Sequence, residues 1–261
     1  MMDSLWVAKT GLEAQQTRMS VVSNNLANVN TTGFKRGRAV FEDLLYEQVR
    51  QVGGSTSEDT ESPTGLALGS GVRVVATEKI FSQGNHMETG NSLDVMVQGR
   101  GFFQVLMPDG DLAYTRDGSF MVDSDGRLVT ANGYEVQPGV SIPPDALAIS
   151  ISSDGLIQAK LPGQSQLSTV GTFQLADFVN PAGLEATGQN LFLETTASGT
   201  AQVGTPGLDG LGMTVQGALE GSNVNVVEEL VNMIETQRAY EMNSKAISTS
   251  DQMLEYLNQT L

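Results

Sequence analysis

Short acidic runs are the first residues in this chain whose types and spacing suggest chemistry, because carboxylates spaced along a loop can bind calcium. Asp123-Ser124-Asp125-Gly126 begins like an EF-hand loop, but that loop needs a glutamate at its twelfth position, which here is Tyr134. Asp109-Gly110-Asp111 is a second short run of the same kind. We interpret both runs as hairpin turns and predict no metal ligands.

The remaining candidates for chemistry are equally sparse. His86 is the only histidine and the chain has no cysteine, so a zinc site, a disulfide and thiol catalysis all lack residues. A Ser-His-Asp site at His86 stays open, although no serine lies in a nucleophile-elbow pattern. Gly99-Arg100-Gly101 precedes a predicted strand and not a helix, which argues against a phosphate-binding loop. We predict no catalytic residue, no cofactor and no enzymatic activity.

The net charge of the chain argues against some classes of binding partner. Thirty acidic residues against 14 basic ones give a net charge of −16, which argues against nucleic acid and against an anionic membrane surface. No stretch approaches the roughly 20 apolar residues of a transmembrane helix. The first residues also lack the basic and apolar regions of a signal peptide. We expect a protein that is cytoplasmic or exported without a cleaved signal, with no direct membrane insertion.

The elements that must position any functional surface begin with a helix between Met1 and Lys35. Apolar and small residues recur there in steps of three and four, which is the a/d pattern of a coiled coil. There is no proline, and the pattern predicts a helix of about 27 residues that ends at Asn28–Gly33. The seam consists of Leu5, Ala8, Leu12, Gln15, Met19, Val22, Leu26 and Val29.

A second helix is predicted for the last stretch, Asn225–Leu261, with Ser222 or Asn223 as its N-cap. Its seam consists of Val226, Leu230, Met233, Gln237, Tyr240, Ser244, Ile247, Asp251, Leu254, Asn258 and Leu261. Further apolar residues widen this face beyond one seam: Val227, Val231, Ile234, Met253 and Leu257.

Two interpretations of these helices stay open. They can pair as a hairpin within one molecule, or they can pack against other copies of the chain. Gln15, Gln237, Ser244 and Asp251 are polar residues at seam positions, and they weaken an isolated pair. We therefore favour helices that become ordered through neighbouring copies.

The segment after the first helix changes character twice. Lys35, Arg36 and Arg38 are interpreted as a solvated basic cluster, and the apolar spacing within 41–49 as a helical or mixed segment. The polar run Gly53–Gly65 has no core-forming residue and predicts a flexible loop or an extended arm within Tyr46–Gly71. The arm residues singled out are Gly53, Gly54, Pro63 and Gly65.

From Val72 onwards the pattern is that of β-structure. Asp-Gly and Asn-Gly pairs recur between apolar runs, which predicts hairpins stacked into a sandwich or a barrel-like domain. These pairs are at 109–110, 117–118, 125–126, 132–133 and 154–155. Strands are expected at Val72–Ala76, Leu93–Gln98, Phe102–Leu106, Ala148–Ile151, Leu156–Ala159, Val170–Phe178, Leu191–Leu193 and Met213–Gln216.

The predicted fold class is α+β. Long N- and C-terminal helices form a coiled-coil-like domain, and a mainly-β domain and an extended arm are inserted between them. The expected domains are residues 1–30 with 225–261 as the helical domain, 31–75 as a connecting region with the arm at 46–71, and 76–224 as the β domain.

Four stretches of the chain together resemble the bacterial flagellar rod and hook proteins. The first is Ser23–Lys35, which reads SNNLANVNTTGFK, and the second is Leu93–Val105, which reads LDVMVQGRGFFQV. The third is Tyr114–Phe120, which reads YTRDGSF, and the fourth is Asn223–Glu241, which reads NVNVVEELVNMIETQRAYE. They occur in the family's order and span nearly the whole chain. Within the family, the length and the polar arm are most similar to the subunits of the distal rod.

The resemblance implies a structural protein whose copies assemble helically into a rigid hollow shaft. The shaft would transmit torque from the motor to the hook and would serve as an export channel. The implied partners are further copies, proximal rod and hook or junction proteins, periplasmic and outer-membrane bushing rings, and the flagellar type III export apparatus. The implied location is the basal body, in the periplasmic rod that crosses towards the outer membrane, after export without a cleaved signal peptide.

The terminal helices would then form the inner tube and the β domain would lie outside. The expected interface residues are Leu5, Leu12, Met19, Val22, Asn24, Asn25, Leu26, Asn28, Gly33, Phe34, Leu230, Met233, Tyr240, Ile247, Leu254 and Leu257. Two alternatives stay open: a hook or proximal rod subunit of the same family, and a secreted β-rich binding module with coiled-coil ends.

Overall fold

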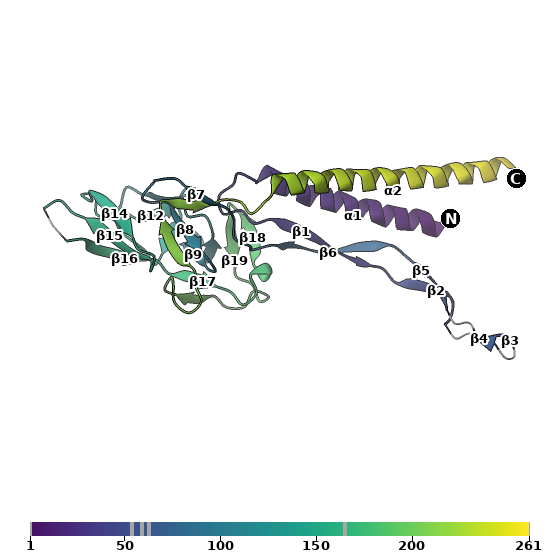
Figure 1. The fold of residues 1–261 in the computed structure, drawn as a ribbon, viewed down its shortest axis with the longest axis horizontal. Coiled ribbons are helices and arrows are strands. Elements are labelled where there is room, and N and C mark those ends of the chain that lie inside the picture. Colours follow the sequence, from purple (N-terminus) through teal and green to yellow (C-terminus); the bar gives the residue numbers. More distant parts are fainter. Residues whose placement is uncertain (1, 53–54, 58–59, 62–63, 164–165, 261) are drawn as a thin grey trace. The chain divides into compact units, whose positions relative to one another are not determined.

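A computed structural model describes residues 2–52, 55–57, 60–61, 64–163 and 166–260. Two long helices at the ends of the chain flank a mostly β middle region, so the predicted α+β class is confirmed (Figure 1). The chain divides into two compact units. Unit 1 contains Met1–Leu26, Gly37–Glu78 and Asn225–Leu261, and unit 2 contains Ala27–Arg36 and Lys79–Val224.

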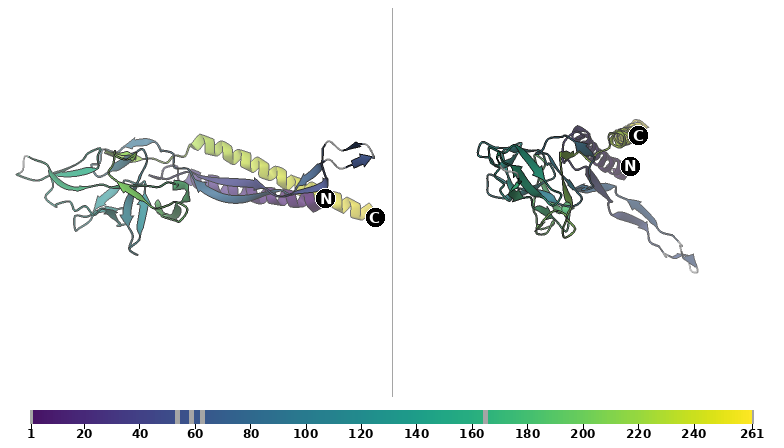
Figure 2. Two further views of the ribbon diagram at one scale, coloured as in Figure 1. Left: turned by 90° about the horizontal axis from the view of Figure 1, so that it is seen from below. Right: turned by 60° about the vertical axis from the view of Figure 1, so that its left-hand side comes forward.

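Unit 1 contains both helices, α1 (Met2–Ala27) and α2 (Val226–Thr260). They lie side by side, and Arg18 of α1 pairs with Glu235 of α2 at 4.0 Å (Figures 1 and 2). The N-cap of α2 is Asn225, because its Oδ1 accepts a hydrogen bond from the backbone N–H of Val227 at 3.1 Å. The prediction of Ser222 or Asn223 as the cap is therefore wrong. Both of those side chains are engaged within unit 2 instead.

The strands of unit 1 form nested pairs. β1 (Gly37–Asp43) pairs with β6 (Val72–Lys79), β2 (Tyr46–Arg50) with β5 (Leu66–Gly69), and β3 (Ser55–Ser57) with β4 (Thr60–Glu61). The expectation of a helical or mixed segment at 41–49 is wrong. Its apolar spacing fits a helix locally, but its backbone pairs with residues some twenty positions further along the chain, which local spacing does not reveal.

The β1–β6 pair follows α1 along its length. Asn25 makes two bonds to Gly37: its Nδ2 donates to the carbonyl oxygen at 2.9 Å and its Oδ1 accepts from the N–H at 2.8 Å. Fifteen residues earlier, Thr10 Oγ1 accepts from the N–H of Val72 at 3.3 Å. Those fifteen helical residues rise about 22 Å, and the seven residues of β1 span about 23 Å. Gly71 has a φ of +119°, and a Cβ there would collide with the Thr10 hydroxyl.

Unit 2 is built from β-strands. Its largest sheet has the order β11-β12-β13-β9-β10-β19-β18, with β17 pairing β9 and β20 pairing β17, and three further strands form the sheet β14-β15-β16. The remaining pairs are β21 with β8 and β22 with β7. The bounds are β7 His86–Glu88, β8 Val95–Gln98, β9 Phe102–Leu106, β10 Leu112–Thr115, β11 Phe120–Val122, β12 Leu128–Thr130, β13 Glu135–Gln137, β14 Ala148–Ile151, β15 Leu156–Lys160, β16 Ser168–Thr172, β17 Leu175–Asp177, β18 Glu185–Gly188, β19 Leu191–Leu193, β20 Gln202–Gly204, β21 Met213–Gln216, β22 Ala218–Glu220, and the 3₁₀ turn η1 Pro181–Gly183.

Aromatic side chains fill the core of unit 2. Phe103 lies edge-on to Phe120 and Phe173, with ring centroids 5.0 and 5.6 Å apart. On a second cluster, Phe102 and Tyr114 each lie edge-on to Phe178. All of these rings are buried, as large apolar side chains usually are in the core of a folded domain.

Most of the predicted hairpin turns are confirmed. Gly110, Gly126, Gly133 and Gly155 have positive φ and connect strands that pair with each other. The prediction at 117–118 is wrong, because β10 and β11 do not pair. Gly118 instead lies so close to the carbonyl oxygen of Val95 that no side chain would fit.

Candidate functional site: surfaces for assembly

The face that α2 turns towards the rest of unit 1 is largely small and polar. Glu229 and Thr236 are the most buried residues among those that the structure describes in α2, and Thr236 Oγ1 donates to the carbonyl oxygen of Asn232 at 2.6 Å. Asn243 faces Gly11 of α1, where an added Cβ would lie 3.0 Å from its Nδ2. The covered side of α2 therefore mixes small and polar groups with the half-buried apolar residues Met233, Ile247 and Leu254.

Many apolar residues of α2 lie on its exposed side, whereas Met233, Ile247 and Leu254 are half-buried. Ile234 is 50% exposed, whereas Thr236, two positions further along, is 1% exposed. The exposed apolar residues include one stripe whose steps of three, four, eight and eleven keep them on one side of the helix: Val227, Val231, Ile234, Met242, Met253 and Tyr256. Val226, Leu230 and Tyr240 lie beside this stripe, and α1 adds Trp6 and Val7. Exposed apolar residues that gather on one helix face are typical of a surface for protein–protein contact.

The predicted seam residues occupy three kinds of position. Leu5, Leu12, Met19, Leu26, Asn28, Met233, Ile247 and Leu254 are half-buried. Asn24, Leu230 and Tyr240 are exposed, Val22 and Asn25 are buried within unit 1, and the side chain of Leu257 lies outside the described residues. The Oε1 of Gln15 is buried and has no hydrogen-bond partner among the residues that the structure describes. The predicted seam is thus only partly covered within one chain.

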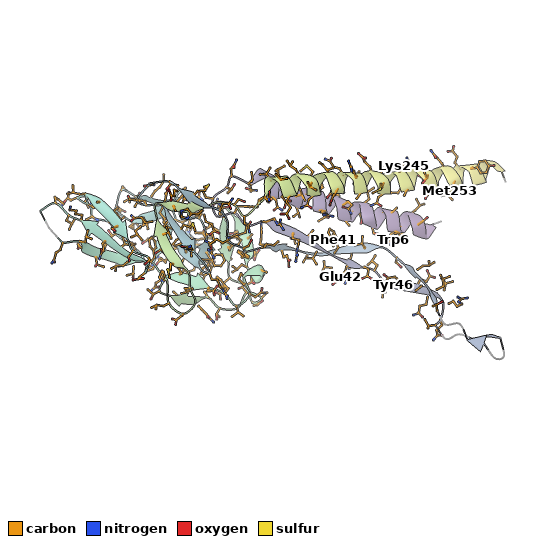
Figure 3. The ribbon with its side chains drawn as sticks, viewed as in Figure 1. Trp6, Phe41, Glu42, Tyr46, Lys245 and Met253 are labelled. Atoms are coloured by element: carbon orange, nitrogen blue, oxygen red, sulfur yellow. The ribbon has the colours of Figure 1, made fainter. Side chains whose placement is uncertain are left out.

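The paired strands β2 and β5 carry a second apolar surface. Every residue of both strands is exposed, and Leu45, just before β2, is 88% exposed. Further exposed apolar residues here are Tyr46, Val49, Val52, Leu66 and Leu68, and Figure 3 labels Tyr46 together with Trp6 and Met253 of the helices. A two-stranded ribbon without a covered face is marginally stable in water.

The arm residues predicted from the sequence lie around these strands. Gly65 is described, and an added Cβ there would lie 2.8 Å from the carbonyl oxygen of Arg50. Gly53, Gly54 and Pro63 lie outside the described residues.

The predicted interface residues Gly33 and Phe34 are buried inside unit 2. The N–H of Gly33 donates to the carbonyl oxygen of Glu220 at 2.8 Å, and Lys79 Nζ lies 4.4 Å from the centre of the Phe34 ring. Gly33 has a φ of +68°, and a Cβ there would approach the backbone of Asp117 too closely. Both residues are therefore accounted for by contacts within one chain.

A buried group of three charges lies beside them, and sequence reasoning missed it. Lys35 Nζ donates to Glu220 Oε1 at 2.6 Å, and Arg116 Nη1 donates to Glu220 Oε2 at 3.2 Å. The interpretation of Lys35 as part of a solvated cluster is wrong, because its side chain is 1% exposed. Lys35 and Arg116 each belong to a stretch that carries the family resemblance, which is the signal that could have pointed to their burial.

Burial dominates the protonation of this cluster. Loss of hydration lowers the pKa of Lys35, and the adjacent Glu220 carboxylate opposes that shift. Loss of hydration also lowers the pKa of Arg116, and the Glu220 carboxylate again opposes the shift. A single carboxylate thus stabilises two buried cations.

The described residues also lack two features that would point to other functions, a metal-binding cluster and a membrane-spanning helix. Within 2–52, 55–57, 60–61, 64–163 and 166–260, no group of three or more histidine or acidic residues is placed to hold a metal ion. Over the same described parts of the chain, neither α1 nor α2 has the long apolar stretch that a membrane-spanning helix needs.

Comparison with known proteins assigns the chain's segments to one family. Residues 5–35 match "Flagella basal body rod protein", residues 96–159 match "Flagellar hook protein FlgE/F/G D1 domain", and residues 215–260 match "Flagellar basal body rod FlgEFG protein C-terminal". The chain is 58% identical over 259 residues to the flagellar basal-body rod protein FlgG of Buchnera aphidicola subsp. Schizaphis graminum, covering 99% of this chain and 100% of that protein.

Sequence identity is higher to rod proteins than to a related hook-basal body complex protein. FlgG of Caulobacter vibrioides is 50% identical over 259 residues, covering 99% of each chain. The flagellar hook-basal body complex protein FlhP of Bacillus subtilis is 32% identical over 271 residues, also covering 99% of each. The match to the rod proteins is therefore stronger than the match to the hook-basal body complex protein.

Proposed function

This chain belongs to the flagellar basal-body rod family, and we propose that its copies assemble helically into the distal rod through the exposed apolar faces of unit 1. The observation that carries the proposal is the stripe of exposed apolar side chains on α2. Polar Thr236 is buried within the chain, while apolar Ile234 faces outwards. Helices that expose their apolar residues gain stability only when neighbouring copies cover them.

In the proposed polymer, α1 and α2 form a coiled-coil-like inner tube around a hollow axis. The half-buried seam residues Leu5, Leu12 and Met19 leave apolar surface that further helices can cover. The small and polar contact between Gly11 and Asn243 fixes the spacing of the two helices within one copy. The tube would carry torque from the motor towards the hook and leave an export channel at its centre.

The paired strands of unit 1 are proposed to act as an extended arm that braces neighbouring copies. This proposal is supported by the exposed apolar surface at Leu45, Val49 and Leu68, because removal of apolar surface from water is favourable. A deletion of residues 53–63 should then give a polymer that bends more easily, measured as a shorter persistence length in electron micrographs. A deletion polymer of unchanged stiffness would remove the bracing role.

Unit 2 is proposed to face outwards, towards the bushing rings of the basal body. The chain's net charge of −16 suits a surface that must slide rather than bind strongly. Proximal rod and hook or junction proteins are the proposed neighbours at the two ends of the polymer. The flagellar type III apparatus is the proposed route into the periplasm.

Hydrogen exchange on dilute monomer and on assembled material tests the proposal. We expect fast exchange in α1 and α2 of the monomer, which slows at least about 100-fold on assembly because the helices are then covered. Unit 2 should exchange slowly in both states and serves as the internal control. Helices already protected in a discrete, non-growing oligomer would instead support a binding module with coiled-coil ends.

A further inference from the structure

The three buried charges of unit 2 come from distant parts of the chain. Lys35 follows α1, Arg116 follows β10, and Glu220 ends β22, so the Lys35–Glu220 pair joins residues 185 positions apart. The exposed fractions of these side chains are 1%, 5% and 0%. Arg116 also donates to two backbone carbonyl oxygens, those of Val97 and Gly99, but its Nε has no partner among the described residues.

Glu220 bonds to the backbone as well as to the two cations. Its Oε1 accepts from the N–H of Gly84 at 2.8 Å, and its own carbonyl oxygen accepts from Gly33. Close by, Asn223 Oδ1 accepts from the N–H of Arg36 at 2.7 Å, and its Nδ2 donates to the carbonyl oxygen of Ile80 at 2.8 Å. Residues 218–223 therefore hold both the segment after α1 and the segment before β7 in place.

The same C-terminal stretch completes two strand pairs. Among the strands that the structure describes, β7 pairs only with β22, and β8 pairs only with β21. β8 carries Val95 and Val97, which are fully buried in the core. The core of unit 2 is thus closed by residues 213–223, which are the last part of the unit in the chain.

Closure of unit 2 without Glu220 would be electrostatically unfavourable. Without the Glu220 carboxylate, closure would bury Lys35 without its carboxylate partner and leave Arg116 with only the weaker influence of Asp177, which is strongly unfavourable. A contact across 185 residues also forms late, because the loop must close before the contact contributes. Both effects disfavour closure before residue 220 is available.

We propose that Glu220 is the closing contact of unit 2, so that a chain whose residues beyond about 213 are still missing or held elsewhere stays open. The segment 33–36 then docks only in the final step, together with residues 218–223. The device keeps a partly synthesised chain from folding prematurely. It concerns the unpolymerised chain and does not depend on the proposed mode of assembly.

Pulsed hydrogen exchange during refolding of the full-length monomer tests the order of closure. We expect the local β9–β10 hairpin, residues 102–115, to gain protection first and residues 33–36, 80–84 and 218–223 to gain it last. The proposal is overturned if those three segments become protected together with the hairpin or before it. This measurement uses the wild-type chain, so it does not depend on whether a variant folds.

Substitution of the charges tests the electrostatic part. Glu220→Gln should raise the unfolding rate about 100-fold or more and leave the rate of hairpin protection unchanged, because its contacts form after that step. The matched control is Asp125→Asn, which breaks an exposed pair with Arg127 in the same unit and should change the unfolding rate less than about twofold. Glu220→Gln that slowed hairpin protection would contradict late closure.

A third variant separates charge from packing. In Lys35→Met/Arg116→Met/Glu220→Leu no charge remains to delay closure, so residues 33–36 should gain protection earlier than in the wild type. If they still gain it last and at the wild-type rate, chain connectivity alone sets the order and the role of Glu220 is wrong. If this variant is unprotected throughout while Glu220→Gln folds normally, the charge argument is equally contradicted.

Discussion

The two units differ in how far one chain buries their apolar residues. Unit 2 buries its phenylalanines against each other and balances two buried cations with one carboxylate. Unit 1 buries Thr236 between its elements and leaves Ile234 and Val227 in water. An exposed apolar stripe is typical of a surface that further copies cover. The core of unit 2 is therefore filled within one chain, whereas unit 1 is proposed to be completed by assembly.

The sharpest way to break this comparison is to place a charge on each unit at a similarly exposed apolar position. Ile234→Asp in α2 should abolish polymer growth, because assembly would bury an unpaired carboxylate in every copy. Met121→Asp in unit 2, where the wild-type side chain is also exposed, should leave growth unchanged. Sedimentation and electron microscopy of the purified variants measure the outcome. Polymers of Ile234→Asp at the wild-type protein concentration would show that this stripe is not an interface.

A second prediction concerns the stability of the unpolymerised chain. Phe103→Ala removes a fully buried ring from unit 2 and should lower the free energy of unfolding by about 3–5 kcal/mol. Val231→Ala removes apolar atoms from an exposed position of α2 and should change it by less than about 0.5 kcal/mol. Urea denaturation of the monomers provides both values. A large loss for Val231→Ala would mean that α2 is already covered within one chain.

The smallest expected effect is the pH dependence that Lys35 contributes to unit 2. Burial lowers its pKa below the ordinary 10.5, so above the native pKa the unfolded chain still holds the proton that the native chain has lost. The free energy of unfolding should therefore rise with pH between the native pKa and 10.5, relative to Lys35→Met. Tyr114 has a raised pKa and acts in the opposite direction above about 10, but it is present in both chains. A difference between the two chains that falls with pH in this window would reverse the assigned shift.

Much of the fold could be predicted because the relevant signals are local. Steps of three and four without proline predicted α1 and α2 nearly to their ends, and glycine at 110, 126, 133 and 155 marked four hairpin turns. The prediction at 41–49 was wrong because its strand partners lie at 66–79, beyond the range of any local pattern. The cap of α2 could not be chosen either, since only the fold shows that Ser222 and Asn223 are bonded elsewhere.

The candidate surfaces, too, could be predicted from the sequence only in part. The apolar residues of α2 were identifiable from the sequence, but an apolar pattern does not say whether one chain or several cover it. The tertiary structure decided that Thr236 is buried and Ile234 exposed, and that Gly11 faces Asn243 between the helices. It also decided that Lys35 is buried, because the carboxylate that stabilises it lies 185 residues away. By itself, the sequence determined the helices, a part of the strands and the family, since backbone propensity and local motifs act over a few residues. Only the tertiary structure decided which faces are covered and which charges are paired, since those depend on contacts between distant residues.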